Sequence, residues 1–224
     1  MGKIRKMSSG RRHRLAEQEY AKANPYEGKS LPGKVWQFIW HDNSVWSWIV
    51  NIILAYIIIR FLVYPGLGAV FGTRIPIVAV VSGSMEHDGS FDDWWQVQQK
   101  WYTGNNITLT TFEGFPLRNG FNKGDLMVLK GEKPQDLKIG DVIVFQSPIQ
   151  SDPIIHRVVK IWQDKTGAYH FQTKGDHNSK SEPGIYETDI TSDKILGKAV
   201  FRIPLLGWVK IGFVGLLNTV GLGR

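Results

Sequence analysis

The chain has 224 residues, a formal net charge of +7 and no cysteine. This length suits one folded domain beside a membrane anchor and leaves little room for two full domains. The lack of cysteine excludes disulfides, thiolate nucleophiles and cysteine-based zinc sites, so covalent catalysis would rest on Ser, Thr, Lys or a carboxylate.

Residues 1–44 are basic, with few acidic side chains and little apolar periodicity. Clustered positive charge can indicate a nucleic-acid partner, but here an apolar segment follows directly, so a membrane explains the charge and no nucleic acid is expected. The segment is predicted to be a cytoplasmic tail. Its cations include Lys3, Arg5, Lys6, Arg11, Arg12, Arg14, Lys22, Lys29 and Lys34.

An apolar run begins at Val45 and carries no charge until Arg60. Extended to Tyr64, it supplies roughly the 20 residues needed to cross a hydrocarbon core of about 30 Å, and Pro65 is expected to end the helix. Residues 45–66 are therefore the predicted transmembrane anchor, with Arg60 near enough to one end for its side chain to reach the interface. Aromatic residues flank the run as interfacial belts do, namely Trp36, Trp40, Trp46, Trp48, Phe61, Tyr64 and Phe71.

The position of the basic tail predicts the orientation of this anchor. Because positive charge accumulates on the cytoplasmic side, the N-terminus is expected inside and everything after Pro65 outside the cell membrane. A removable signal peptide is the alternative interpretation, but the charged region of such a peptide is not normally about forty residues long.

Residues 67–202 are predicted to form a mainly β, antiparallel domain. Short β-branched runs separated by Gly, Pro, Asn and Asp carry this prediction, at 77–81, 126–129, 141–145, 154–161 and 169–173. An insertion at about 88–120 interrupts them, where Ser90 and Asp93 form a capping box before a short amphipathic helix rich in tryptophan. That helix could rest on the membrane surface or pack onto the β domain.

Residues 203–224 are apolar again, with Lys210 as an interruption. The segment is expected to associate with the membrane, either as a second transmembrane helix or as an embedded helix. If it crosses, Arg224 returns to the cytoplasmic side, in agreement with the positive-inside rule.

Three segments carry the residue types of a serine hydrolase. Ser82-Gly83-Ser84-Met85 places a hydroxyl in a turn after a strand, His156 lies in an apolar strand, and Lys174-Gly175-Asp176 follows a later strand. Each is an ordinary structural pattern alone, since serines and Gly-Asp pairs are frequent in turns. Their occurrence together favours catalysis, because a serine needs an imidazole to take its proton and a carboxylate to orient that imidazole.

These segments, in this order, resemble type I signal peptidases. The resemblance covers the chain from about Val45 to its end, apart from the tryptophan-rich insertion, and includes the two Gly-Asp strands at Gly124-Asp125 and Gly140-Asp141 and the His156-Arg157 pair. Bacterial members have a lysine base where this chain has His156, so the resemblance points to the archaeal and endoplasmic-reticulum branch, and the C-terminal segment resembles archaeal members.

The resemblance implies a role for each matching residue. Ser84 matches the nucleophile, His156 the general base, and Ser82 a position whose hydroxyl assists the oxyanion hole in bacterial relatives. Asp176 matches one family acid; a second acid, usually Asp, falls at Glu182. Either Asp176 or Glu182 could orient His156. No cofactor and no metal are implied.

The predicted function is a membrane-bound serine endopeptidase that cleaves signal peptides from secreted and membrane preproteins. Its expected partners are preprotein signal peptides, membrane lipid and the protein-export translocon. A substrate would lie extended beside the strand at 77–81, with shallow pockets suited to an A-x-A-like cleavage site.

Three other interpretations compete with this one. A metal hydrolase could use His87, Asp88, His156, Asp176 and His177, but the chain has no H-E-x-x-H and no tight ligand spacing. Self-cleaving Ser-Lys repressors would need a DNA-binding helix-turn-helix and a lysine in place of His156. The alternative from another class is a non-catalytic membrane subunit of a protein-export complex.

Overall fold

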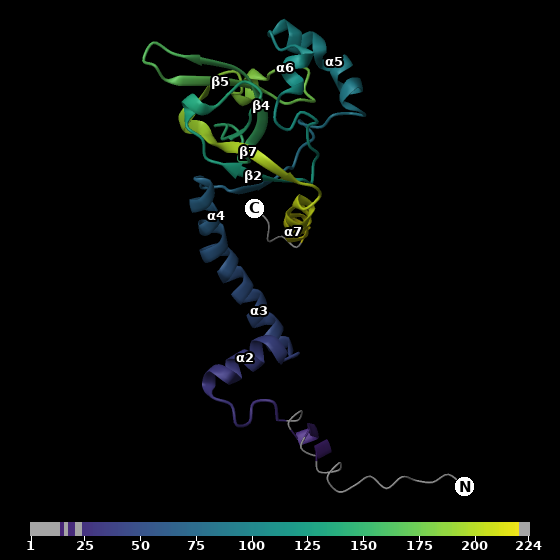
Figure 1. The fold of residues 1–224 in the computed structure, drawn as a ribbon, viewed down its shortest axis with the longest axis vertical. Helices are drawn as coiled ribbons and strands as arrows, with labels where there is room; N and C mark the ends of the chain where they lie inside the picture. Colours follow the sequence, from purple (N-terminus) through teal and green to yellow (C-terminus); the bar gives the residue numbers. More distant parts are fainter. Residues whose placement is uncertain (1–13, 16–17, 21–23, 220–224) are drawn as a thin grey trace, which may run out of the picture. The chain divides into compact units, whose positions relative to one another are not determined.

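The computed structural model describes residues 14–15, 18–20 and 24–219, so residues 1–13, 16–17 and 21–23 of the predicted basic tail, and Arg224, lie outside the described residues. The chain divides into two compact units, residues 1–63 and 64–224. Figure 1 shows the elements of both units. The described helices are α2 (Leu31–His41), α3 (Val45–Ile58), α4 (Tyr64–Phe71), α5 (Phe91–Gly104), α6 (Leu109–Glu113) and α7 (Gly207–Thr219).

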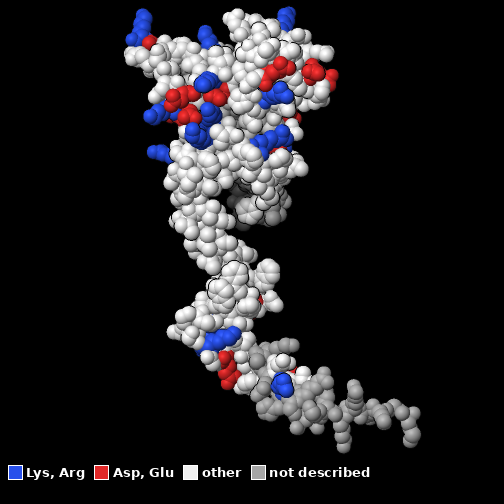
Figure 2. Space-filling model, in the orientation of Figure 1, with Lys and Arg blue, Asp and Glu red and all other residues white. Residues whose placement is uncertain are grey.

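A single helical segment, Val45–Phe71, is long and apolar enough to cross a membrane, judged by length and composition among the described residues. The face drawn in Figure 2 shows uncharged surface along this segment. The helix does not end at Pro65, contrary to the sequence prediction. A π-helical turn, Ile59–Val63, stands directly before α4, where the proline ring would otherwise clash with the carbonyl of the preceding turn. This local widening of the helix is the physical reason that it continues to Phe71.

The second unit contains one seven-stranded sheet, in which every strand pairs antiparallel to its neighbours. The strand order is β1-β2-β7-β3-β4-β5-β6, so β1 and β6 are the edge strands. The expected mainly β, antiparallel fold is confirmed. The strands are β1 (Ile77–Ala79), β2 (Leu126–Lys130), β3 (Val142–Phe145), β4 (Ile154–Gln163), β5 (Tyr169–Lys174), β6 (Ile190–Thr191) and β7 (Ile195–Ile203).

Two apolar clusters form the core around this sheet. One is built from β1, β2, β3, β4 and β7 together with Met85 and Phe121, and the other from β3, β4, β5 and β6. All four residues of β3 are buried, as expected for a strand covered on both faces. This strand lies between β7 and β4, so the core supports the strand that carries His156.

The insertion forms α5 and α6, and the capping box of Ser90 and Asp93 is confirmed at the start of α5. Trp94 and Trp95 are buried in an aromatic cluster with Tyr102. The tryptophans of this helix therefore pack onto the domain, which is the second of the two predicted alternatives. Val97 on the opposite side of the helix is 77% exposed.

The C-terminal segment turns after β7 into α7. Trp208 at its start lies so close to Gly124 that a Cβ on this glycine would be 1.9 Å from the indole nitrogen. The backbone φ of Gly124 is +91°, which only glycine adopts readily. Leu205, Val209 and Phe213 are exposed.

Candidate active site

Ser84 lies in the turn that follows β1, at the free edge of the sheet. Its hydroxyl is 3.2 Å from that of Ser82. Backbone hydrogen bonds fix the turn from two sides, because His177 N–H donates to the Ser84 carbonyl at 2.9 Å and Phe121 N–H donates to the Met85 carbonyl at 3.0 Å. Met85 itself is fully buried, so the residue after Ser84 anchors this turn in the core.

His156 stands in β4, paired with Ile143 of β3. Its side chain is only 4% exposed, yet it lines the same cavity as Ser82 and Ser84. This cavity has a volume of about 530 Å³. The structure thus brings Ser84 and His156, two residues 72 positions apart, to one cavity.

Gly175 packs between the serine turn and the histidine. A Cβ at this position would lie 2.7 Å from the Ser84 carbonyl oxygen and 2.9 Å from Nε2 of His156. Contacts under 3.0 Å are essentially never made by real Cβ atoms. Only glycine therefore lets the Lys174-Gly175-Asp176 segment approach both residues, and Nε2 of His156 faces this segment.

Glu187 is the carboxylate that contacts His156. Its Oε2 is 2.5 Å from Nδ1 of His156 and accepts a hydrogen bond from the Thr173 hydroxyl at 3.1 Å. Its Oε1 accepts the backbone N–H of Glu182 at 2.6 Å. Glu187 is fully buried. An ionised carboxylate only accepts hydrogen bonds, so with Glu187 ionised this contact requires a proton on Nδ1, and in a neutral imidazole Nε2 is then the acceptor.

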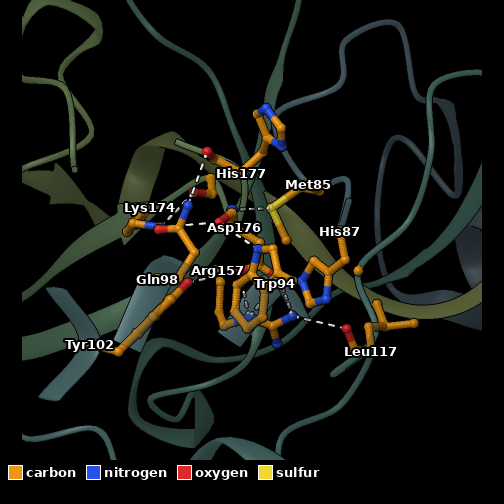
Figure 3. Close-up of polar contacts among 12 residues, drawn as sticks. Met85, His87, Trp94, Gln98, Tyr102, Leu117, Arg157, Lys174, Asp176 and His177 are labelled. Carbon is orange, nitrogen blue, oxygen red and sulfur yellow. Dashed lines mark hydrogen bonds and ion pairs between the residues drawn. The ribbon is translucent and has the colours of Figure 1, made fainter. Parts of the chain in front are cut away.

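Asp176 is held in a different network, shown in Figure 3. Arg157 donates to both of its carboxylate oxygens, at 2.7 Å from Nη2 and 2.9 Å from Nε. The Tyr102 hydroxyl donates to Oδ1 at 3.0 Å, and Nε2 of His87 lies 3.1 Å from Oδ2. Burial raises the pKa of the Asp176 carboxyl, but the Arg157 charge and the hydrogen bonds outweigh it and hold the pKa well below its usual range.

Neither acid predicted from the sequence therefore contacts His156. Asp176 is occupied by Arg157, whereas Glu182 is exposed and its side chain accepts the N–H of Gly184. The physical reason is a turn after Glu182: a 3₁₀ segment, Pro183–Ile185, followed by Tyr186 with a φ of +62°. This turn returns the chain to Thr173, whose N–H donates to the Glu187 carbonyl. Glu187 was missed because the family spacing selects Glu182, and the Pro-Gly pair between them was the available signal of a turn.

Lys174 is buried near the site but is directed away from the cavity, toward α5. Its Nζ donates to Oε1 of Gln98 at 3.0 Å and to the carbonyls of Gly175 and Asp176. The same ammonium group lies 4.6 Å from the ring centre of Tyr102. Burial lowers the pKa of Lys174 to about 8. With its donors committed in this way, Lys174 binds the insertion to the strand β5.

The candidate metal ligands are not brought together. His87 and Asp176 touch, His156 is bound to Glu187, and His177 is 3.6 Å from Asp88. Across residues 14–15, 18–20 and 24–219, no group of three or more His, Asp or Glu side chains is arranged to hold a metal ion.

The cavity continues as a groove along β1. Apolar residues from β1, β3 and β4 line it, and Gln150 and Asp152 contribute polar groups. Because β1 is an edge strand paired only with β2, its other side can add an extended peptide as a further strand. The apolar lining residues are Ile75, Ile77, Val78, Ala79, Val81, Val144, Pro153, Ile154, Ile155 and Ile185.

The described residues combine an antiparallel sheet, which carries a serine turn and a buried histidine at one cavity, with one long apolar helix. No protein-family model matches the chain. The chain is, however, similar to curated signal peptidase subunits. It is 31% identical over 155 residues to the signal peptidase complex catalytic subunit SEC11 of Eremothecium gossypii, which covers 67% of this chain and 73% of that relative.

Two further relatives agree. The chain is 28% identical over 153 residues to the catalytic subunit sec11 of Dictyostelium discoideum, covering 67% of each protein. It is 27% identical over 153 residues to the catalytic subunit SEC11C of Homo sapiens, of which it spans only 63%. The chain belongs to the family of signal peptidase complex catalytic subunits, which confirms the resemblance found in the sequence.

Proposed function

We propose that this protein is a membrane-bound serine endopeptidase that removes signal peptides from preproteins. Ser84 is the nucleophile and His156 the general base. The observation that carries the proposal is that His156, paired with the buried Glu187, lines the same cavity as Ser84. The family membership adds the substrate class.

The proposed reaction is acyl transfer. Nε2 of His156 takes the Ser84 hydroxyl proton as Oγ attacks the scissile carbonyl, and the same imidazole then protonates the leaving amine. Water hydrolyses the resulting ester with His156 again as the base. In this structure the Ser84 hydroxyl is paired with Ser82, and catalytic hydrogen bonds commonly tighten only when substrate binds.

Glu187 is the proposed orienting acid, in place of Asp176 or Glu182. Its charge stabilises the imidazolium that forms when His156 takes the proton. The backbone N–H of Ser84 and the Ser82 hydroxyl are the proposed donors to the oxyanion, where one donor is typically worth roughly 2.7–4 kcal/mol.

The substrate is proposed to bind as an extended strand along the free edge of β1. Backbone hydrogen bonds to an edge strand give affinity that does not depend on the substrate's side chains. The apolar groove admits small side chains. This combination suits the small residues that precede a signal peptide cleavage site. Asp176 is proposed to support the site structurally, since it binds Arg157, the neighbour of His156.

The proposed topology has the segment Val45–Phe71 across the cell membrane, residues 1–44 in the cytoplasm and the sheet domain outside. The positive-inside rule supports this orientation. The preprotein would then meet the site on the outer side, beside the translocon.

Cleavage of a preprotein by the purified full-length protein in detergent tests the proposal. The wild-type chain should release a signal peptide of defined length, identified by mass spectrometry of both products, and Ser84→Ala should release none while keeping its circular dichroism spectrum. Ser192→Ala, a substitution in a short turn away from the cavity, is the matched control and should cleave normally. Cleavage by Ser84→Ala would show that the proposed mechanism is wrong, and failure of all three proteins would favour a non-catalytic subunit.

A further inference from the structure

The helix α2 has one apolar and one polar face. At 3.6 residues per turn, Leu31, Val35 and Ile39 form one row along it, and Pro32, Trp36 and Trp40 form the adjoining row. Gly33, Gln37 and His41 form a row on the other side. The apolar rows are largely uncovered, because Leu31, Val35, Trp36 and Trp40 are each between 57% and 79% exposed.

The polar face, in contrast, has a partner within the chain. Nζ of Lys29 donates a hydrogen bond to Oε1 of Gln37 at 2.6 Å. Lys34 adds a second cation to the helix, and its residue is exposed. A helix whose polar side is satisfied and positively charged and whose apolar side is bare has the pattern of a helix that lies in a membrane surface.

Hydrogen bonds fix α2 to the foot of α3. The Ser47 hydroxyl donates to the carbonyl of Phe38 at 2.6 Å, and the Asn51 amide donates to the carbonyl of Ile39 at 2.9 Å. These acceptors are among the last four carbonyls of α2, which have no partner within their own helix. Ser47 is fully buried at this elbow. Figure 1 shows α2 set across the foot of α3 instead of continuing in line with it.

We propose that α2 lies in the plane of the membrane surface, with the apolar face of Leu31, Val35, Trp36 and Trp40 in the boundary between lipid headgroups and acyl chains. The inference rests on the proposed membrane span, because only three residues separate the end of α2 from the start of α3. A helix hydrogen-bonded to the foot of a membrane-spanning helix stands at the level of the headgroups, where tryptophan side chains are favoured. The elbow of Ser47 and Asn51 holds α2 in that plane.

Lipid, and not a partner protein, is the occupant that these features select. The helix α3, to which α2 is hydrogen-bonded, also exposes apolar residues near its start, Val45, Trp46 and Trp48, and lipid covers α3 in the proposed topology. Lys29 and Lys34 complement the negative headgroups of anionic lipids, at roughly 1 kcal/mol for each cation close to the surface. A membrane surface accepts any arrangement of apolar side chains, so it requires no groove or pocket on α2.

The absence of cysteine makes the test direct, since a single introduced cysteine carries a spin label at one known site. Val35→Cys reports on the apolar face, and Gln37→Cys is its matched control on the polar face of the same helix. The labelled full-length proteins are reconstituted into vesicles of phosphatidylcholine and phosphatidylglycerol in equal parts. Relaxation of each label by oxygen, which concentrates in lipid, is compared with relaxation by a water-soluble nickel chelate.

We expect the label at 35 to respond several-fold more strongly to oxygen than to the nickel chelate, and the label at 37 to show the reverse. Equal access of nickel to both labels would overturn the proposal, because α2 would then lie in water. Shielding of the label at 35 from both reagents would also overturn it, in favour of a protein partner.

Two further variants separate the parts of the proposal. A label at Ile53→Cys, within α3, should be accessible to oxygen alone; access of nickel to it would overturn the membrane span and the inference together, whereas preprotein cleavage in detergent tests the peptidase independently. Combining Val35→Cys with Ser47→Ala and Asn51→Ala should reduce the contrast between oxygen and nickel and increase the mobility of the label. An unchanged contrast would overturn the role of the elbow.

Discussion

The backbone N–H of Glu182 donates a hydrogen bond to the carboxylate of Glu187, at 2.6 Å. Glu182, which stands at the spacing of the family acid, therefore uses its backbone to position Glu187, the acid that contacts His156. Because this contact needs no side chain at position 182, the two glutamates should respond differently to mutation.

Glu187→Gln should abolish nearly all activity, whereas Glu182→Ala should cleave at close to the wild-type rate. Glutamine keeps the shape of Glu187 but removes the charge and can present an N–H to Nδ1, which favours the wrong imidazole tautomer; in a serine triad the comparable change lowers kcat by about 10⁴. Rates of preprotein cleavage in detergent measure both effects. An inactive Glu182→Ala beside an active Glu187→Gln would reverse the assignment.

Gly175→Ala should separate the proposed nucleophile and base without unfolding the domain. The added Cβ would collide with the Ser84 carbonyl and with Nε2 of His156, and a misplacement of about 1 Å can cost about 10² in rate. Gly104→Ala is the matched control, because its Cβ would meet no atom within 4 Å. We expect the fold-decrease in kcat to be at least ten times the fold-increase in KM. Equal rates in the two variants would exclude the predicted crowding.

Asp176→Asn should act on stability more than on the chemistry. It removes the charge that compensates the fully buried Arg157, and breaking a buried ion pair from one side typically costs about 3–5 kcal/mol. Thermal unfolding in detergent, followed by circular dichroism, should show a fall in Tm of the order of ten degrees, from about 2–4 °C for each kcal/mol. A full loss of activity at an unchanged Tm would instead assign Asp176 a direct catalytic role.

The pH dependence of stability should carry a contribution from Lys174. Its pKa is lowered from 10.5 to about 8 by burial, so between these values the unfolded chain binds a proton that the folded chain has released. The free energy of unfolding then rises with pH across this window. The Tm of the wild type should therefore rise by a few degrees relative to the Tm of Lys174→Met from pH 7 to pH 10. A difference that is constant with pH would contradict this.

Features of the fold that depend on local pattern could be predicted from the sequence. The apolar run from Val45 identified the long helix, and Ser90 with Asp93 identified the start of α5, because a capping box is complete within four residues. Pro65 misled the prediction, because the π-helical turn that accommodates it leaves no sequence mark. Proline rules describe regular α-helices.

In the candidate site, too, the residues in local sequence motifs could be predicted, and those placed by turns and burial could not. Ser84 and His156 stood in recognisable segments, and the structure places both at one cavity. Glu187 could not be found from spacing, since the left-handed residue Tyr186 and the turn before it decide which glutamate returns to the sheet. The role of Arg157 as the partner of Asp176 depends on burial, which sequence spacing does not report.

The insertion carries a consequence for attempts to shorten this protein. Trp94 and Tyr102 of α5 donate hydrogen bonds to Asp176, and Gln98 accepts one from Lys174. A chain trimmed to its sheet would thus expose a guanidinium, a carboxylate and an ammonium group whose present positions depend on exclusion of water. A minimal catalytic domain made from this sequence must keep α5, although that helix contributes no residue to the cavity.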